Sequence, residues 1–278
     1  MAPAVNEDAA IPLAGRRVAV TAAGATATHI AAALTALGAT PSMTPCVAIE
    51  PVSGSDATAL RCALDAIARY DWVVLTSTNA AGAVAAALRT RERGLPRIAA
   101  VGSSTAGALR AGGITDVVIP ETALATGIPR VMGDVAGRRI LVPRGDLAAP
   151  DLPRALRAAG AIVDEPLAYR TVPGPGCAEL GAAIRARNLD AVTFASGSAV
   201  RYFVGACGGP GRHALAAGDA TRTACIGPST AAVAREMGVV VHAVAATHDA
   251  AGLARAVVDA LRGSDAARAQ EERYDRLS

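Results

Sequence analysis

The chain has 278 residues, enough for two domains of ordinary size, and 52% of them are hydrophobic. Only 3% are aromatic, so the cores must be built from Ala, Val, Leu and Ile, which favours helices packed on sheets over an aromatic-rich β-sandwich. The formal net charge of +3 is small, which argues against a partner that is a nucleic acid or a membrane surface. All 27 basic residues are arginine, and the lack of lysine excludes Schiff-base enzymes and a Walker A motif.

Short apolar segments alternate with helical segments along the first half of the chain. We expect strands at residues 18–21, 72–75, 98–101 and 117–119, and an extended segment at 41–49. We expect helices at residues 29–37, 56–69, 79–89, 104–110 and 122–132. The same alternation continues from Ile140. Short apolar strands between helices predict an α/β fold in which parallel sheets are covered on both faces.

The first half of the chain is repeated about 120 residues later. Three segments return in the same order: 13–21 as 135–143, 71–77 as 190–196, and 101–106 as 226–231. This period is far above that of solenoid repeats, so the repeated unit is the size of a domain. The duplication predicts two similar lobes, with small ligands bound in a cleft between them.

Two proline-bounded extended segments, 44–51 and 166–173, stand at matching places in the two copies. If both are crossovers, the lobes exchange their starts. Residues 1–46 and 174–262 then form lobe one, residues 50–168 form lobe two, and the two extended strands form a hinge. A simple division near residues 133–137 is the alternative, and the spacing alone does not decide between them. Residues 263–278 are rich in charge and are expected to form a solvated tail.

The cysteines and histidines do not form a recognised metal or disulfide pattern. The five cysteines include no CxxC pair, and no apolar leader precedes them, which is typical of reduced, cytoplasmic cysteine. The four histidines show no HxH or HExxH spacing, so we expect no metal. Residues 18–49 carry almost no charge, but glycines and prolines interrupt the run, and we expect no membrane partner.

Hydroxyl side chains follow four of the predicted strands. They stand in the segments 76–79, 102–105, 196–198 and 227–230 and include Ser77, Thr105, Ser196, Ser198, Ser229 and Thr230. Ligands of open parallel sheets bind at the carboxyl ends of the strands, where helix N-termini attract carboxylates and phosphates. Four such turns in two symmetric pairs favour a shared anion-binding surface. The simpler alternative is that each hydroxyl only caps a helix.

Tyr169 and Arg170 lie in the second crossover, and Arg144 follows a predicted strand. A phenol on a hinge strand can donate a hydrogen bond to a leaving oxygen. The alternatives are a tyrosine ring that only packs at the hinge and arginines that are solvated surface groups. No Ser-His-Asp or Cys-His arrangement can be assembled from the sequence, and no GxGxxG motif follows the first strand, which disfavours a dinucleotide-binding oxidoreductase.

Taken together, the chain resembles the uroporphyrinogen-III synthase family over about residues 13–262. The resemblance is carried by five segments in order: Leu141-Val142-Pro143-Arg144-Gly145-Asp146, residues 166–171, residues 190–200, residues 224–231 with Gly238-Val239, and Thr247-His248-Asp249 through Leu253. It implies two flavodoxin-like parallel-sheet lobes that exchange their N-terminal segments and are joined by a two-stranded hinge.

The resemblance also implies the reaction. Hydroxymethylbilane, the small-molecule substrate, loses water, its terminal ring is inverted, and the macrocycle closes to uroporphyrinogen III without a cofactor. By resemblance, Tyr169 assists loss of the hydroxyl as the catalytic residue, and the substrate is bound by the hydroxyls of Ser77, Thr105, Ser196, Ser198 and Thr230. We add Ser229 and Arg144 as further candidate substrate-binding residues. A transient handover of substrate from the deaminase is implied as well.

One departure from the family pattern stands after the first strand. Many members carry an arginine there, and this chain has Thr21-Ala22-Ala23-Gly24, which removes one carboxylate partner. The alternative function is therefore a catalytically weak relative that binds or senses tetrapyrroles with the same fold. A periplasmic-type binding protein is a third class, but it needs an export signal that the N-terminus lacks.

Overall fold

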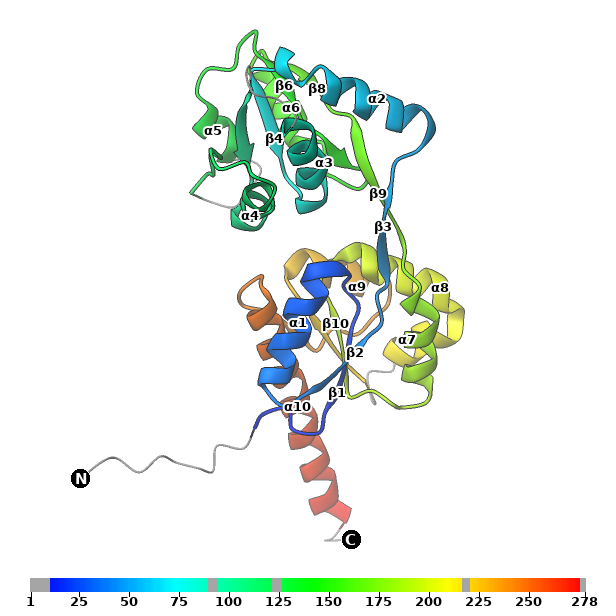
Figure 1. The fold of residues 1–278 in the computed structure, drawn as a ribbon. Coiled ribbons are helices and arrows are strands. Elements are labelled where there is room, and N and C mark those ends of the chain that lie inside the picture. Colours follow the sequence, from blue (N-terminus) through cyan, green and yellow to red (C-terminus); the bar gives the residue numbers. More distant parts are fainter. Residues whose placement is uncertain (1–10, 90–94, 122–126, 217–220, 276–278) are drawn as a thin grey trace, which may run out of the picture. The chain divides into compact units, whose positions relative to one another are not determined.

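The computed structural model describes residues 11–89, 95–121, 127–216 and 221–275, which form two compact units. The first unit combines residues up to Ala48 with residues from Val172 onward, and the second runs from Ile49 to Thr171. Both units are mixed α/β structures with parallel sheets, as the sequence predicts (Figure 1). None of the helices in the described ranges has the length and apolar character that crossing a bilayer requires.

The first unit is built on a five-stranded parallel sheet in the order β12-β11-β10-β1-β2. Its strands are β1 (Arg17–Val20), β2 (Thr40–Met43), β10 (Ala191–Phe194), β11 (Arg222–Cys225) and β12 (Ala243–Val244). Its helices are α1 (Gly24–Ala36), α7 (Gly176–Arg185), α8 (Gly197–Ala216), α9 (Pro228–Glu236) and α10 (Ala250–Asp275). Residues expected to begin a tail at 263 therefore continue α10.

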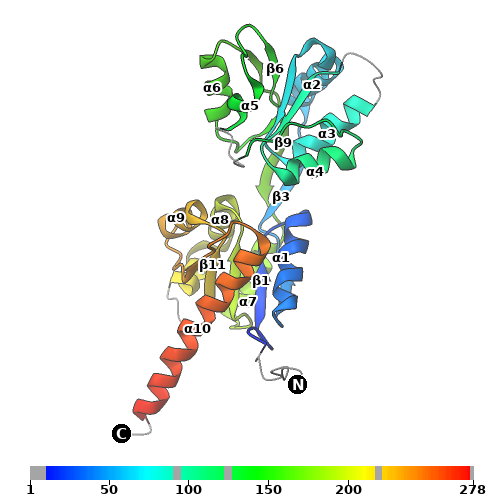
Figure 2. The same ribbon diagram turned by 90° about the vertical axis from the view of Figure 1, so that its left-hand side faces the viewer.

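Alternate residues of the interior strand β1 enter two different cores. Val18 and Val20 pack with α1 and α10, while Ala19 packs with α7, α8 and α9 on the other face. Figure 2 shows α1 and α10 beside each other on the first of these faces. All three β1 side chains are fully buried, as expected for a parallel sheet covered on both sides.

The second unit contains a four-stranded parallel sheet in the order β5-β4-β6-β8. Its strands are β4 (Trp72–Leu75), β5 (Arg97–Ala100), β6 (Arg139–Leu141) and β8 (Ile162–Asp164). Its helices are α2 (Gly54–Asp65), the 3-10 turn η1 (Ile67–Arg69), α3 (Thr78–Arg89), α4 (Ser103–Ala111), α5 (Ile128–Met132) and α6 (Asp151–Ala158). Val73 and Leu75 face the core with α2, α3 and α4, while Trp72 and Val74 face the core with α5 and α6.

A third sheet has the order β3-β9-β7, with β3 (Val47–Pro51), β9 (Leu167–Pro173) and β7 (Arg144–Gly145). Both boundaries between the units fall inside strands of this sheet, after Ala48 in β3 and after Thr171 in β9. The single extended segment expected at residues 41–49 is thus two strands, because Thr44-Pro45-Cys46 interrupts the ladder.

Two other expected elements differ from the structure. The strand expected at residues 117–119 is reduced to an isolated bridge between Ala99 and Val118. The helix expected at residues 122–132 is observed as α5 only, and residues 122–126 of that prediction lie outside the described residues.

In the first unit, Asp190 holds the beginning of β1 against β10. The Arg17 backbone N–H donates to Asp190 Oδ2 over 2.7 Å, and Arg16 Nη1 donates to Oδ1 over 3.3 Å. These residues are separated by more than half of the chain, yet their strands are direct neighbours in the sheet. The start of the chain therefore completes a sheet whose other central strands come from the second half.

Asp71 makes the equivalent contact in the second unit. The Arg139 backbone N–H donates to Asp71 Oδ2 over 2.8 Å, and Arg138 Nη1 donates to Oδ1 over 3.0 Å. The backbone hydrogen bond from Arg139 is the main reason that the pKa of Asp71 lies below its usual range. The two contacts match the repeated Gly-Arg-Arg and Asp segments, and they support the interpretation that the copies exchange their starts.

Asp71→Asn should destabilise the second unit at neutral pH and lose this effect in acid. The pKa of Asp71 is lower in the folded state, so its contribution is present above the unfolded value of about 3.9 and is lost as the pH falls through the folded value. Urea unfolding of the wild type and of the variant at pH 7 and at pH 3 measures this. Asp116→Asn, at an exposed position of the same unit, is the control. A stability difference that is equal at both pH values would contradict the assignment.

Gly176→Ala should destabilise the first unit by about 1–3 kcal/mol, because its Cβ would overlap the backbone of the preceding crossover. That Cβ would lie 2.5 Å from Pro45 N and also against Thr44 C, while the Gly176 N–H donates to Pro45 O over 2.9 Å. Gly205→Ala on α8, where a Cβ meets nothing within 4 Å, is the matched control. Thermal unfolding compares the two variants. Equal unfolding midpoints would show that the backbone at Thr44 and Pro45 can move aside without loss of stability.

Candidate functional site

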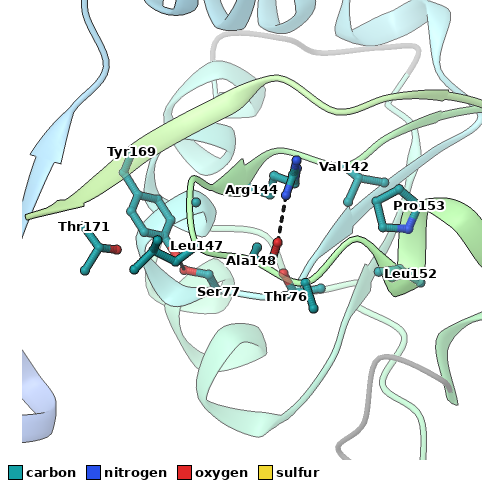
Figure 3. Close-up of a pocket in the computed structure, with 12 residues that line it drawn as sticks. Thr76, Ser77, Val142, Arg144, Leu147, Ala148, Leu152, Pro153, Tyr169 and Thr171 are labelled. Atoms are coloured by element: carbon teal, nitrogen blue, oxygen red, sulfur yellow. Dashed lines mark hydrogen bonds between the residues drawn. The ribbon is translucent and has the colours of Figure 1, made fainter. Parts of the chain in front are cut away.

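A pocket of about 340 Å³ opens in the second unit, at the carboxyl end of β4 and beside β7 and β9. Tyr169, Ser77 and Thr171 lie toward one end of it, and Val142, Leu152 and Pro153 form an apolar wall at the other (Figure 3). Arg144 lies between the two groups. The pocket therefore combines an oxygen-rich end with an apolar surface.

Tyr169 is a half-buried residue of β9. Its ring packs against the core beneath α3 and α4, and its hydroxyl donates a hydrogen bond to Ser77 Oγ over 3.0 Å. The ring therefore packs against the core while the hydroxyl lies at the pocket. Because a serine hydroxyl is uncharged and can rotate, the phenol can exchange this partner for another oxygen in the pocket.

Ser77 stands between β4 and α3 and caps that helix. Its Oγ accepts the Asn79 N–H over 3.1 Å, and its carbonyl accepts the Ala81 N–H over 3.2 Å. The cap fixes Ser77 at the positive end of α3 and so fixes the partner of Tyr169.

Arg144 lines the pocket, but its charge is already engaged. Nη1 donates to Ala148 O over 2.8 Å, the contact drawn in Figure 3, and Nε lies 3.0 Å from Glu165 Oε2, although not in hydrogen-bonding geometry. Glu165 is also paired with Arg157 over 2.7 Å. The two arginines and the glutamate form one ion-paired cluster, and Arg144 shapes the loop that forms the edge of the pocket.

Tyr70, in the same unit, shows why the partner of a tyrosine matters. Its hydroxyl donates to Asp164 Oδ2 over 2.8 Å, and burial together with this hydrogen bond raises its pKa to about 12. A phenol held by a carboxylate is a poor proton donor to anything else. Tyr169, whose hydroxyl is hydrogen-bonded to a neutral serine, is better placed than Tyr70 to donate a proton to a ligand.

The hydroxyls of the first unit gather at the carboxyl ends of β10 and β11, which are neighbouring strands. Ser196 Oγ lies 3.0 Å from Ser198 Oγ and accepts the Ala199 N–H over 3.3 Å, so this pair caps α8. Ser229 and Thr230 lie in the first turn of α9, where Ser229 is exposed and Thr230 is buried. The N-cap residue of α9 is Gly227, which has no side chain with which to cap the helix. Helix N-termini of this kind attract anions.

Thr105 occupies the matching place in the second unit. It is buried in the first turn of α4, which likewise has no side-chain cap, but it is not part of the pocket. The pocket thus brings together Ser77, Arg144 and Tyr169 of the predicted site residues. The others stand at helix N-termini, where the structure is consistent with either capping or anion binding.

Other segments singled out in the sequence have structural roles. In Thr247-His248-Asp249, the Gly252 N–H donates to Asp249 Oδ1 over 2.7 Å, which caps α10 and lowers the pKa of Asp249. Arg170, considered above as a surface group, is exposed and forms an ion pair with Asp56 over 2.5 Å.

Several pocket residues were not predicted as site residues, among them Thr76, Gly145, Leu147 and Thr171. Gly145 carried a signal, since it lies in the Pro143-Arg144-Gly145-Asp146 segment. Leu147 carried none, because an apolar residue in a loop has no distinguishing pattern. In the described part of the chain no group of three or more His, Cys, Asp or Glu side chains is arranged to hold a metal ion.

The comparison with protein-family models decides the family. Residues 28–255, most of the chain, match the model described as "Uroporphyrinogen-III synthase HemD". The chain belongs to the uroporphyrinogen-III synthase family.

Individual members of the uroporphyrinogen-III synthase family are similar in sequence and in fold. A uroporphyrinogen-III synthase from Synechococcus elongatus is 34% identical over 199 residues, which cover 69% of this chain and 75% of the relative. A porphyrin biosynthesis protein HemD from Ruminiclostridium josui is 27% identical over 81% of this chain, which spans 45% of that relative's length. The crystal structure of a mutant uroporphyrinogen III synthase from Thermus thermophilus superimposes with a TM-score of 0.61 at 23% identity, covering 90% of this chain and all of that one.

Proposed function

We propose that this protein is a uroporphyrinogen-III synthase that converts hydroxymethylbilane into uroporphyrinogen III. The hydroxyl on the ring at one end of the chain leaves as water, the ring at the other end is inverted, and the macrocycle closes. The observation that carries the proposal is the Tyr169 hydroxyl, which lies in a pocket and is held by a neutral, rotatable partner, Ser77, in a chain of this family.

Loss of the hydroxyl needs a proton, because hydroxide is a poor leaving group. In the proposed step, the Tyr169 phenol turns from Ser77 to the substrate oxygen and donates its proton as the carbon–oxygen bond breaks. Ser77 can then rotate its own proton toward the phenolate while its Oγ still accepts the Asn79 N–H. The pyrrole nitrogen shares the positive charge left on the carbon.

Ring closure restores the starting state of the enzyme. The α-carbon by which the ring at the other end is bonded to the chain attacks the cationic carbon, and a carbon–carbon bond forms. The older bond from this α-carbon to the chain then breaks, and the released chain carbon bonds to the ring's free α-carbon, which inverts the ring. The proton lost on rearomatisation returns to the phenolate. Water is the only by-product, and no electrons are transferred. The step is therefore a lyase reaction that calls for no redox cofactor, and its catalysis consists mainly of holding the reacting ends in the correct geometry.

The pocket suits one substituted pyrrole ring rather than a whole tetrapyrrole. Its apolar wall of Val142, Leu152 and Pro153 can face the ring, with the ring's hydroxymethyl group toward Tyr169. We propose that this is the end ring that carries the hydroxymethyl group, not the ring that is inverted. The remaining carboxylates would be bound by the uncapped N-termini of α4 and α9 together with Thr105, Ser229 and Thr230, and by Ser196 and Ser198. Arg144 contributes a nearby positive charge.

The setting of the enzyme follows from the same chemistry. The substrate would be received from the deaminase that makes it, since an open-chain hydroxymethyl pyrrole cyclises on its own if left free. We place the protein in the cytoplasm, which agrees with the free thiols of Cys62 and Cys225.

Activity is tested by supplying porphobilinogen and the deaminase, and by separating the type I and type III isomers after oxidation. We expect mostly uroporphyrinogen III when this protein is present and type I alone when it is absent. Type I alone in the presence of folded protein would reject the enzyme. In that case the alternative, a tetrapyrrole-binding relative weakened by the missing arginine after β1, is tested by titration with the product.

Tyr169→Phe should lower kcat by about tenfold or more and change KM little, because it removes a proton donor but keeps the ring. Tyr70→Phe is the control, since it also removes a hydroxyl from the second unit but outside the pocket. Initial rates of type III formation compare the variants. A folded Tyr169→Phe protein with wild-type kcat would remove the role assigned to this phenol.

A further inference from the structure

Gly145 faces Tyr169 across the short parallel ladder between β7 and β9. Arg144 pairs with Leu167, and Gly145 pairs with Tyr169. One residue along β7 thus corresponds to two residues along β9, which is a shift of register at this point. At this irregularity the Tyr169 ring lies against the β7 backbone. The tyrosine therefore lies over a glycine.

A side chain at position 145 would occupy the space that the ring takes. A Cβ built on Gly145 would lie 2.5 Å from Tyr169 Cζ, 2.6 Å from Cε2 and 2.7 Å from Oη, all below any ordinary van der Waals contact. Gly145 is not among the glycines with positive φ, so its backbone conformation suits any residue. The glycine is thus required for space, at the end of the ring that carries the hydroxyl.

The ring cannot escape by moving its strand. The Asp146 N–H donates to Tyr169 O over 3.3 Å, and the Thr171 N–H donates to Asp146 Oδ1 over 2.8 Å, which ties β9 to the residue after Gly145. A methyl group at position 145 would instead rotate the side chain and break the 3.0 Å hydrogen bond from Tyr169 Oη to Ser77 Oγ.

We propose that Gly145 is a positioning residue of the reaction: its missing side chain lets the Tyr169 ring lie against β7, so that the phenol meets both Ser77 and the leaving hydroxyl. This role rests on the proposed function, because it matters for catalysis only if the Tyr169 phenol is the proton donor. Gly145 acts only through Tyr169 and touches no reacting atom itself.

The kinetic test compares Gly145→Ala, Tyr169→Phe and the double variant. Gly145→Ala should lower kcat by about tenfold with less than about threefold change in KM, and the double variant should be no slower than the slower single variant, because both changes remove one effect. Gly82→Ala on α3 is the matched control, since its Cβ would meet nothing within 4 Å and its activity should be that of the wild type.

A stability test needs no activity and covers the case in which Gly145→Ala folds poorly. Gly145→Ala should lower the unfolding midpoint in the wild-type background but leave it unchanged in a Tyr169→Ala background, where the ring that it would strike is gone. A Gly145→Ala protein that folds only when Tyr169 is also alanine supports the same contact. Equal losses in both backgrounds would overturn it.

The outcomes separate this proposal from the one on which it rests. Wild-type kcat in Gly145→Ala, or losses that multiply in the double variant, overturn the positioning role while the synthase assignment stands. A wild-type protein that yields only type I uroporphyrinogen overturns the synthase assignment and the role of Gly145 with it, whatever the stability test shows.

Discussion

Each parallel sheet depends on a pairing between distant parts of the chain, and an aspartate at the edge of one strand secures it. Asp190 accepts the first N–H of β1, and Asp71 accepts the first N–H of β6. These carboxylates set the register in which the buried strands meet, because a slip by one residue would turn every side chain to the opposite core. Val18 and Val20 would then change places with Ala19, and both faces of the sheet would lose their packing. The same register fixes where each strand ends, and so fixes the positions of the candidate site residues that come directly after the strands.

The class of fold was predictable because it rests on local pattern. The buried strand β4 is an unbroken apolar run, and β10 is apolar except for the buried Thr193. The sequence predicted the strands less well where pairing with distant residues decides whether a segment forms a strand. Residues 117–119 are apolar enough for a strand, yet only Val118 forms a bridge. Residues 41–49 read as one extended segment, and Pro45 divides them in a way that depends on Gly174 and Gly176 packing against the same backbone.

The sequence predicted the types of residue in the candidate site but not the contacts between them. Hydroxyls after parallel strands indicated Ser77, and the resemblance indicated Tyr169 and Arg144. The sequence could not show that Tyr169 and Ser77, 92 residues apart, share a hydrogen bond, or that Glu165 engages Arg144. Ser196 and Ser198 form a helix cap, as Ser77 does, and the sequence pattern does not show which of these hydroxyls lies at a pocket. The apolar wall of the pocket and the space above Gly145 are properties of packing, and no local pattern marks them.

The positions at which β3 and β9 leave one unit and enter the other have a consequence for biosynthesis. The second unit is a continuous stretch from Ile49 to Thr171, so all of it has emerged from the ribosome before the first unit can be completed. Strand β1 is made early but must wait for β10, its neighbour in the sheet, which lies in the last third of the chain. The amino-terminal segment, with its almost uncharged apolar run, is therefore the part of the nascent protein that is exposed for the longest time. It is the natural place for a chaperone to act.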